Sequence, residues 1–435
     1  MPRLLLALQS LRSQSRRTRS ELENLRDRQI RELVAHAYAN VPFYRRLYDM
    51  HGISPGKVRG FGDLPMLPLA TRSEVQRAAE SDLVARGIDP RTLRIRRTNG
   101  TTGEPLSVRR TSAESALLRL YYFQAFRSLG VRRTDLSVGI RLPRPGSAHP
   151  SVNLPRKIAN RAGLYARVTL VAEDPMRLLE ALKRLSPAIL GGVPGLLSTI
   201  AARWPAEARE EIRSANWPRL VVTGGERLTP SVRTHLRDVF GARVLDMYSS
   251  HEFNLIASEC PATGSYHVSD ETVALEVLDG TRSAMPGDTG QPVGTALHSF
   301  AAPLIRYALG DLVTMGTTQC DCGVPHSTIR EIQGRIMHYL ELPDGMIVHH
   351  NKIEEAVGYA AGWVRQTQVS HPRMDLLVLR LAPLRDPSAE EIDHVRTSVE
   401  AYLHHHVTVE IVIDPDLGPE DGEKFRPLIP LPATT

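Results

Sequence analysis

The residues of this chain that could do chemistry gather in a few short segments rich in glycine and small polar residues. The first is Thr98-Asn99-Gly100-Thr101-Thr102-Gly103, which lies between two short stretches of alternating apolar residues. Glycines let a ligand approach the backbone closely, and backbone N–H groups together with threonine hydroxyls surround phosphate oxygens. The Gly-Lys-Ser/Thr ending of a Walker loop is absent. The segment predicts a phosphate-binding loop, with a tight hairpin turn as the alternative.

Three further segments follow apolar runs of strand type. Thr223-Gly224-Gly225-Glu226 is the first, and a plain turn between a strand and a helix is its alternative. In the second, Tyr248 could stack on a base and Glu252 could hold Mg²⁺, a hard ion that prefers oxygen ligands. In the third, Asp311 follows a glycine on a short turn and could accept both hydroxyls of a ribose. The alternatives are a packed tyrosine, a surface glutamate and an aspartate in an ordinary turn.

All three cysteines of the chain fall close behind two of these segments. Cys260 precedes His267, and Cys320 and Cys322 precede His326. Thiolates and an imidazole in two distant pairs fit a closed Cys₃His structural zinc site. His267 is the preferred fourth ligand and His326 the second choice. Two buried thiols and one free thiol are the alternative.

The elements that must position these residues repeat one theme in the middle of the chain, a short apolar strand, a small-residue turn and a helix. Strands predicted at 168–171, 188–190, 220–222 and 244–247 alternate with helices, one of them capped by Asp174 before Pro175. This alternation indicates a parallel or mixed α/β sheet, in which ligands bind at the carboxyl ends of the strands. Near the N-terminus, apolar spacing predicts a helix over 20–47, which Pro42, Phe43 and Tyr44 end.

The last hundred residues predict a small α+β unit. Strands are expected at 374–381 and 407–413, with a helix from Ser388 to about His404 between them. Ser388 and Glu391 form a capping box at the start of that helix. We therefore predict an α/β fold with a large N-terminal domain, residues 1–334, and a small C-terminal α+β domain, residues 335–435.

Composition narrows the class of protein. The chain has 435 residues and a net charge of +6, and its basic residues form no aromatic-interleaved patch, which argues against a nucleic-acid partner. Three cysteines, an odd number, argue against a disulfide framework and for a reducing cytoplasm. No apolar run approaches the roughly 20 residues that span a bilayer. The oligomeric state stays open, with a homodimer as one expectation.

In this order and spacing, the segments resemble the core motifs of the adenylate-forming superfamily, which covers acyl-CoA synthetases, peptide-synthetase adenylation domains and luciferases. Residues 35–44, Asp63-Leu64-Pro65 and Pro303-Leu304-Ile305-Arg306-Tyr307 resemble the phenylacetate–CoA ligase branch. That branch also includes proteins assigned to capsular polysaccharide synthesis. The resemblance runs nearly from end to end and implies a mobile C-terminal domain.

The resemblance also implies a role for each matching residue. Thr98 to Gly103 look like the phosphate loop, Gly225 and Glu226 the adenine-side turn, Tyr248 the residue that packs on adenine, Ser249 and Ser250 the neighbours of the substrate carboxylate, Glu252 the Mg²⁺ ligand, Asp311 the ribose ligand, Arg335 the ribose-reaching arginine before the hinge, and Lys424 the bridge between the carboxylate and the α-phosphate. Such a lysine stabilises developing charge by electrostatics. The chain holds only five lysines, so the match at Lys424 is informative.

The implied function is ATP-dependent activation of a carboxylic acid as its acyl-adenylate, followed by acyl transfer to CoA. The cofactors would be ATP, Mg²⁺ and CoA, with zinc as a structural ion. There are two alternatives to this function. The chain could pass the acyl group to an amine, or it could be a non-catalytic nucleotide-binding relative in polysaccharide synthesis. The acid pocket is expected among residues 120–145, 191–195 and 224–250. Two departures from the family pattern are Glu104, where lysine is frequent, and Ile336-Met337-His338, where an aspartate often follows the arginine.

Overall fold

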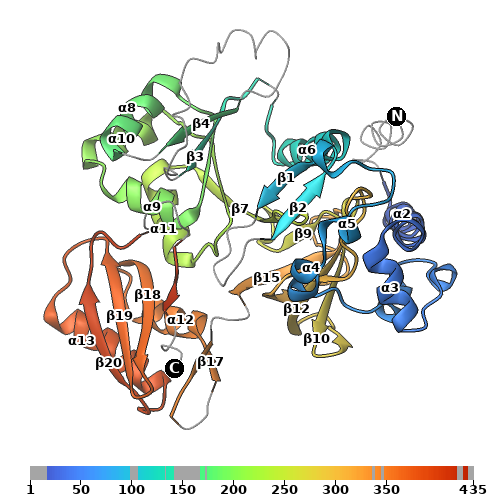
Figure 1. Ribbon diagram of the computed structural model, residues 1–435. Helices are drawn as coiled ribbons and strands as arrows, with labels where there is room; N and C mark the ends of the chain where they lie inside the picture. The colour runs from blue at the N-terminus through green and yellow to red at the C-terminus, as the bar shows by residue number, and fades with distance from the viewer. Residues whose placement is uncertain are drawn as a thin grey trace. The chain divides into compact units, whose positions relative to one another are not determined.

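The computed structural model describes residues 17–97, 106–132, 134–141, 167–171, 174–335, 339–343, 347–418 and 425–429. Its internal contacts divide the chain into two compact units (Figure 1). The first unit comprises Met1–Val131 and Met247–Gln333, and the second comprises Arg132–Asp246 and Gly334–Thr435. Among the described residues, no helix is both long enough and apolar enough to span a membrane.

The first unit begins with helices and continues with mainly antiparallel strands. Its helices are α2 (Arg19–Asn40), α3 (Pro42–Met50), α4 (Arg72–Arg77), α5 (Glu80–Leu83) and α6 (Ser112–Ser128), with 3₁₀ turns at Pro55–Lys57, Phe61–Met66 and Pro90–Thr92. Its strands are β1 (Arg94–Arg97), β2 (Ser107–Arg110), the end of β7 (Arg243–Ser250), β8 (Asn254–Glu259), β9 (Tyr266–Val268), β10 (Val273–Asp279), β11 (Arg282–Ser283), β12 (Thr289–Ala296), β13 (Tyr307–Ala308), β14 (Asp311–Met315) and β15 (Thr328–Arg335).

The region predicted as one helix over 20–47 forms two helices, α2 and α3, and the first ends just before Pro42, the residue predicted to end it. Thr18 and Glu21 form a capping box that starts α2. The chain is extended at Val41, with φ −112° and ψ 108°. Proline disfavours the helical conformation in the residue before it, and Pro42 then serves as the first residue of α3.

The sheet of the first unit runs in the order β11-β10-β12-β14-β15-β9-β8-β7. Its pairs β7–β8, β8–β9, β9–β15 and β10–β12 are antiparallel. One hydrophobic cluster of this unit includes Tyr248 and Tyr307, and another, with Tyr44 among its members, joins the N-terminal helices to Ile305. β1 and β2 form a separate antiparallel pair, connected by residues 98–106.

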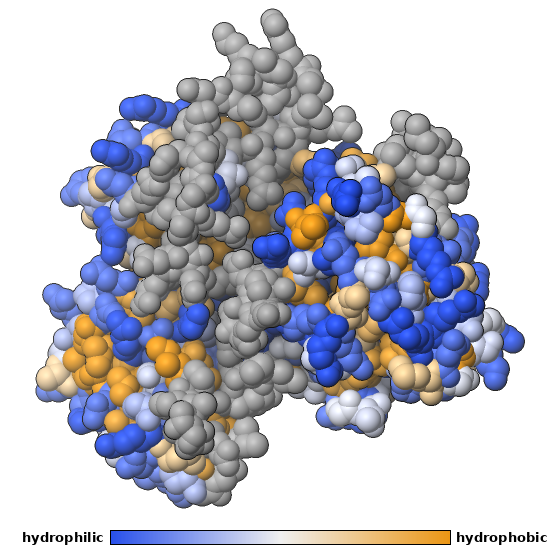
Figure 2. Space-filling view, viewed as in Figure 1, coloured by the Kyte–Doolittle hydropathy of each residue, from blue (hydrophilic) through white to orange (hydrophobic). Residues whose placement is uncertain are grey.

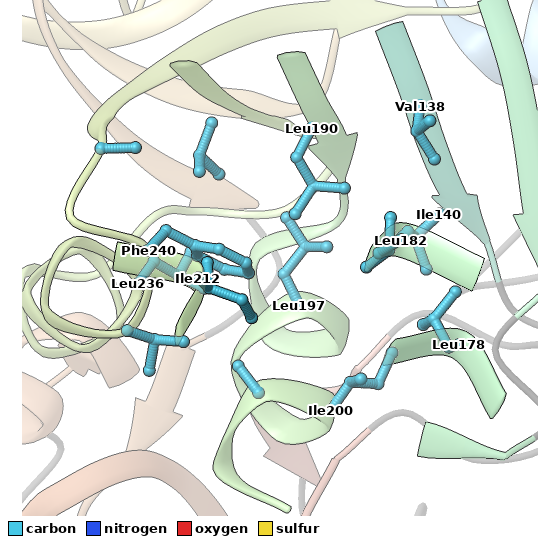
Figure 3. Close-up of a cluster of buried hydrophobic side chains, with 14 of the residues drawn as sticks. Val138, Ile140, Leu178, Leu182, Leu190, Leu197, Ile200, Ile212, Leu236 and Phe240 are labelled. Atoms are coloured by element: carbon cyan, nitrogen blue, oxygen red, sulfur yellow. The ribbon is translucent and has the colours of Figure 1, made fainter. Parts of the chain in front are cut away.

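The second unit contains a parallel sheet and a C-terminal α+β part. The parallel strands are β3 (Ser137–Arg141), β4 (Arg167–Val171), β5 (Ile189–Gly192) and β6 (Leu220–Gly224), with helices α8 (Pro175–Leu185), α9 (Pro194–Ala202), α10 (Ala206–Ser214) and α11 (Pro230–Phe240). Strand order is β6-β5-β3-β4, all parallel. Figure 3 shows the core on one side of these strands, where Leu178 and Leu182 lie near Ile140 and Phe240 lies near Ile212.

The C-terminal part of the second unit is a four-stranded sheet covered by two helices. Its elements are β16 (Tyr339–Glu341), β17 (Ile347–His349), α12 (His350–Ala360), β18 (Val364–Arg373), β19 (Leu376–Pro383), α13 (Ala389–Tyr402), β20 (Thr408–Ile413) and β21 (Leu428–Ile429). The strand order is β20-β19-β18-β21. The alternating burial along β19 and β20 places one face against the helices and leaves the other partly open. Figure 2 shows hydrophobic side chains gathered over this part of the molecule, where Val412 is 44% exposed.

The elements confirm the predicted α/β fold class. Asp174 caps α8 through the N–H groups of Met176 and Arg177, and Gly241 ends α11 in the left-handed conformation. The predicted boundary between 334 and 335 stays a prediction. The chain does leave the first unit after Gln333, but residues 132–246 group with the C-terminal segment rather than with the rest of the N-terminal region.

Candidate nucleotide and metal sites

Two predicted nucleotide residues meet in the first unit. Tyr248, in β7, donates its hydroxyl to Oδ2 of Asp311, at the start of β14, over 2.6 Å. Both side chains are nearly buried, at 8% and 9% exposure. The two residues are 63 positions apart in sequence, and the sheet brings them together. Hydrogen bonds to an ionised acceptor are shorter and stronger than those between neutral groups. A strong bond from the Tyr248 hydroxyl therefore fixes the orientation of the Asp311 carboxylate.

The predicted magnesium ligand lies in the turn between β7 and β8. Glu252 is buried, at 7% exposure, and its Oε1 lies 3.9 Å from Nη1 of Arg72 at the start of α4. Ser249 and Ser250, half-buried at the end of β7, precede the turn, and Ser250 Oγ accepts the N–H of Phe253 over 3.1 Å. These contacts hold the predicted serines and the glutamate on one short hairpin.

Sequence reasoning missed Arg110, at the end of β2. Its guanidinium donates to the backbone carbonyl of His251 over 3.0 Å and to that of Glu252 by a shorter contact. Burial lowers the pKa of Arg110 to about 10, with Glu114 acting in the opposite direction, so it stays protonated at neutral pH. The strand that follows the predicted phosphate loop is thereby tied to the turn of Glu252. An arginine beside Arg109 in a short strand carries no sequence signal for such a role.

The segments that resemble the phenylacetate–CoA ligase branch also contact one another in the first unit. Arg306 makes a buried two-point ion pair with Glu276, at 3.0 and 2.9 Å, and donates to the carbonyls of Pro65 and Leu67. Tyr44 hydroxyl accepts the N–H of Ile305 over 2.8 Å. Arg306 therefore joins segments far apart in sequence and contributes to the scaffold around the Asp311 turn.

The four preferred zinc ligands lie together in the first unit. The Sγ atoms of Cys260, Cys320 and Cys322 and a ring nitrogen of His267 all lie within 4.8 Å of one another. Cys260 and Cys320 are 3.8 Å apart at sulfur, and Cys322 Sγ lies 3.3 Å from His267 Nε2. Tetrahedral zinc with bonds of about 2.3 Å to sulfur separates two thiolates by about 3.8 Å. The donor set and its spacing fit zinc.

His267, and not His326, joins the thiols. His326 lies instead between two acids, with Nδ1 3.8 Å from Asp270 Oδ2 and Nε2 3.7 Å from Glu271 Oε1. Burial lowers the pKa of His267 to about 4, assisted by His326, so the imidazole is neutral at pH 7. A neutral imidazole is the form that binds metal.

The second unit holds the remaining described site residues. Gly225 and Glu226 follow β6, and Gly225 has a φ of 89°, a conformation that glycine adopts readily. Near the end of β6, Thr223 Oγ1 donates over 2.7 Å to Oδ1 of Asp246, in the middle of β7. Arg335 is exposed at the end of β15, next to Gly334 with a φ of 109°. Left-handed φ values near the predicted hinge favour glycine there.

Two sets of predicted residues lie outside the described part of the chain, Thr98 to Gly103 and Lys424. Of the predicted pocket residues, Tyr121 is buried and stacks on His298, with ring centroids 5.4 Å apart. The predicted pocket segments fall in both units, and the pocket stays a prediction.

Comparison with solved structures identifies the class of fold. A structure of 2-hydroxyisobutyryl-CoA ligase in the postadenylation state, in complex with 2-HIB-AMP, has a TM-score of 0.74 at 20% identity, covering 92% of this chain and 88% of that one. The anthranilate CoA ligase AuaEII, in complex with anthranoyl-AMP, has a TM-score of 0.54 at 16% identity and covers 84% of this chain and 73% of its own. The fold is that of the adenylate-forming CoA ligases.

Sequence comparison narrows the class. The chain is 27% identical over 337 residues to the phenylacetate-coenzyme A ligase of Thermus thermophilus, covering 73% of this chain and 71% of the relative. It is 25% identical over 307 residues to the enzyme of the same name from Escherichia coli K12, with 68% and 67% covered. No family model matches the chain. These relatives bear out the predicted resemblance of the chain to the phenylacetate–CoA ligase branch of the adenylate-forming proteins.

Proposed function

We propose that this chain activates a carboxylic acid with ATP, forms its acyl-adenylate with release of pyrophosphate, and passes the acyl group to CoA. The observation that carries the proposal is the buried bond between Tyr248 and Asp311. It joins the two segments predicted to bind adenine and ribose, on a fold shared with ligases whose structures contain acyl-adenylates. The curated relatives, named phenylacetate-coenzyme A ligase, support CoA as the acceptor.

In the first step, a carboxylate oxygen of the substrate attacks the α-phosphorus of ATP, and the bond to the β-phosphate oxygen breaks. Tyr248 would pack on adenine while Asp311 accepts ribose hydroxyls, which fixes the nucleoside. Glu252 would hold Mg²⁺, which neutralises phosphate charge when bound. Lys424 would bridge the carboxylate and the α-phosphate, where a positioned cation stabilises the developing charge. Thr98 to Gly103, which precede β2, would surround the phosphates.

In the second step, the CoA thiolate would attack the acyl carbonyl and release AMP. The segment after Arg335 departs from the family pattern, so acyl transfer to the acceptor is tested separately from adenylation. Gly334, with its φ of 109°, supports a hinge before a mobile C-terminal domain of residues 335–435. An amine acceptor and a non-catalytic nucleotide-binding relative remain the alternatives.

The test is carboxylate-dependent exchange of pyrophosphate into ATP across aromatic, aliphatic and amino acids. We expect exchange with one class of acid, and a loss of about 100-fold or more in Lys424→Ala. Lys57→Ala, which removes an exposed lysine, serves as the matched control. Adding CoA or amines to the active mixture then identifies the acceptor. ATP binding without exchange for any acid would favour the non-catalytic alternative.

We also propose that Cys260, His267, Cys320 and Cys322 hold one structural zinc ion. The support is the donor set, its spacing and the neutral state of His267. Such a site has no open position for catalysis. Metal analysis of protein purified under reducing, chelator-free conditions should give close to one equivalent of zinc, and less than about half would count against the site.

The cellular setting is the last part of the proposal. A cytoplasmic location follows from cysteine usage, and cell fractionation tests it. A homodimer is the assembly that we would test first, by light scattering of the purified chain. A monomer at micromolar concentration would contradict that assembly without affecting the proposed reaction.

A further inference from the structure

Glu226 makes a contact in the second unit that its predicted place beside adenine did not anticipate. Its Oε1 accepts the backbone N–H of Phe425 over 2.9 Å, across 199 residues of sequence. Phe425 directly follows Lys424. The carboxylate at the end of β6 therefore holds the chain one residue after the lysine proposed to act in adenylation.

The carboxylate of Glu226 packs closely against helix α9. A Cβ atom added at Gly195, in α9, would lie 3.1 Å from Glu226 Oε2 and 2.9 Å from Gln366 Nε2. Contacts this short require a neighbour to move, so glycine at 195 lets the carboxylate and the Gln366 amide lie against the helix backbone. The rotamer of Glu226 is thus restricted by its surroundings.

The segment that Glu226 holds is also tied to the C-terminal sheet. Val369 N–H donates to the carbonyl of Pro427 over 2.8 Å, and Gln368 Nε2 donates to that of Arg426 over 2.9 Å. β21 then pairs with β18 in parallel. The hydrogen bond from Phe425 to Glu226 ties the first described residue of this segment to the turn after β6.

The chain before the lysine is anchored as well. The carbonyl of Leu417 accepts from Arg365 Nη2 over 3.2 Å and from Thr199 Oγ1 over 3.5 Å. Gly418 lies so close to Thr199 that an added Cβ would be 2.8 Å from its hydroxyl oxygen. In sequence, the chain is therefore held before Lys424, where Leu417 and Gly418 contact α9, and after it, where Phe425 contacts the turn that follows β6.

We propose that Glu226 is a positioning residue for adenylation, which holds the Phe425 amide so that Lys424 is delivered to the reacting groups. This inference rests on the proposed function. Consecutive Cα atoms lie about 3.8 Å apart, so the anchor at Phe425 is one residue along the chain from the lysine that it would position. A carboxylate suits the task because an ionised acceptor binds an N–H more strongly than a neutral one.

The anchor is tested first without reference to activity, by hydrogen–deuterium exchange of the peptide that contains Phe425. Glu226→Ala should exchange this amide about 10-fold faster or more, because the bond to a charged acceptor is lost. Glu226→Gln keeps an acceptor oxygen and should show a smaller increase. Glu207→Gln, at an exposed position of the same unit, should match wild type. Unchanged exchange in Glu226→Ala would overturn the inference, whether or not the chain is a ligase.

The positioning role is tested by a double-mutant cycle on adenylate formation, with enzyme in excess over labelled ATP so that slow single turnovers are counted. Alone, Glu226→Ala should slow adenylate formation about 10- to 100-fold. In a Lys424→Ala background it should change the rate less than about 2-fold, because a residue that acts through Lys424 has nothing left to position.

Three results would overturn the inference. These are an equal loss in both backgrounds, no loss in either, and a weaker affinity for ATP in Glu226→Ala that accounts for the slower rate. The last would mean that Glu226 contacts the nucleotide directly. A wild-type chain that forms no adenylate would instead refute the proposed function, and the exchange measurement at Phe425 would still decide the anchor.

Discussion

The hydroxyl of Tyr248 meets the carboxylate of Asp311 where both side chains are almost removed from solvent. A buried carboxylate requires a hydrogen-bonding partner, and the bond in turn fixes which way its oxygens face. The same tyrosine would offer its ring to adenine. Tyr248 would therefore have two separable roles, a ring that packs on adenine and a hydroxyl that orients Asp311.

Tyr248→Phe separates these roles, because it keeps the ring and removes the donor. We expect ATP to bind about 5- to 20-fold more weakly, which corresponds to about 1–2 kcal/mol for a hydrogen bond to a charged group. Titration with a fluorescent ATP analogue measures the change. Tyr38→Phe is the control, since it removes an exposed bond from Tyr38 to Asp49 of 2.9 Å. Unchanged affinity in Tyr248→Phe would contradict the role of the hydroxyl.

Arg110→Met tests the support beneath Glu252. The change leaves the carbonyls of His251 and Glu252 without their guanidinium donor, which should cost about 2–3 kcal/mol of unfolding free energy. A looser turn should also raise the Mg²⁺ concentration for half-maximal pyrophosphate exchange by about 10-fold. Urea unfolding and a magnesium titration are the measurements. Arg109→Met, which removes the more exposed pair with Glu80, should leave the magnesium dependence as in wild type.

At the scale of elements, the cysteine cluster lies where two connections meet. Cys260 follows β8 and His267 lies in β9, while Cys320 and Cys322 lie between β14 and β15. β9 pairs with both β8 and β15. A metal ion there would tie the strand that follows the Glu252 turn to the strand that begins at Asp311.

Chelation should therefore destabilise the folded chain. We expect a strong zinc chelator to lower the unfolding free energy by several kcal/mol, because binding to an ordered site contributes to folding. His267→Ala should lower both the zinc content and the stability, and should be insensitive to the chelator. His326→Ala should keep about one equivalent of zinc. Zinc content and urea unfolding of both variants are the measurements. Zinc retained in His267→Ala but lost in His326→Ala would make His326 the fourth ligand.

At the scale of the whole molecule, a partly buried ion pair joins the two stretches of chain that form the second unit. Arg227 Nη1 lies 3.0 Å from Glu354 Oε2, and the side chains are 16% and 12% exposed. Burial raises the pKa of Glu354 to about 7, although Arg227 acts to lower it. Near neutral pH this glutamate therefore titrates while the protein is folded.

The sign of the pH effect follows from linkage. Between its ordinary pKa of about 4.5 and its folded pKa of about 7, Glu354 binds its proton more tightly in the folded state than in the unfolded state. Its contribution is present at low pH and lost as pH rises through 7, by at most about 3 kcal/mol. Glu354→Gln should reduce the fall in unfolding free energy between about pH 5 and pH 8. Glu390→Gln, at an exposed site of the same unit, should not.

Urea unfolding at several pH values between these limits measures both variants against wild type. The comparison is needed because other groups titrate over the same range. A pH profile of Glu354→Gln that runs parallel to that of wild type would show that the pair has an ordinary carboxyl pKa. A flatter profile in the variant would confirm that this pair couples protonation to the stability of the unit.

Local patterns predicted most of the elements because their causes lie within a few residues. The caps at Asp174 and Ser388 and the stop at Gly241 each act on the helix beside them. The end of the first helix was predicted from Pro42, but the second helix that begins at this proline was not, because proline both ends one helix and suits the first position of the next. Where the chain divides into compact units also depends on contacts that no local pattern reports.

By itself, the sequence determined the residue types in each segment, and therefore the family resemblance, the α/β class and the proposed set of zinc ligands with His267 preferred. Tertiary structure alone decided which of these residues meet. The Tyr248–Asp311 bond, the support of Glu252 by Arg110, and the contact of Glu226 with the Phe425 amide each join residues from 63 to 199 positions apart. Motif spacing is a property of the chain, whereas such contacts depend on how its strands pair and its helices pack.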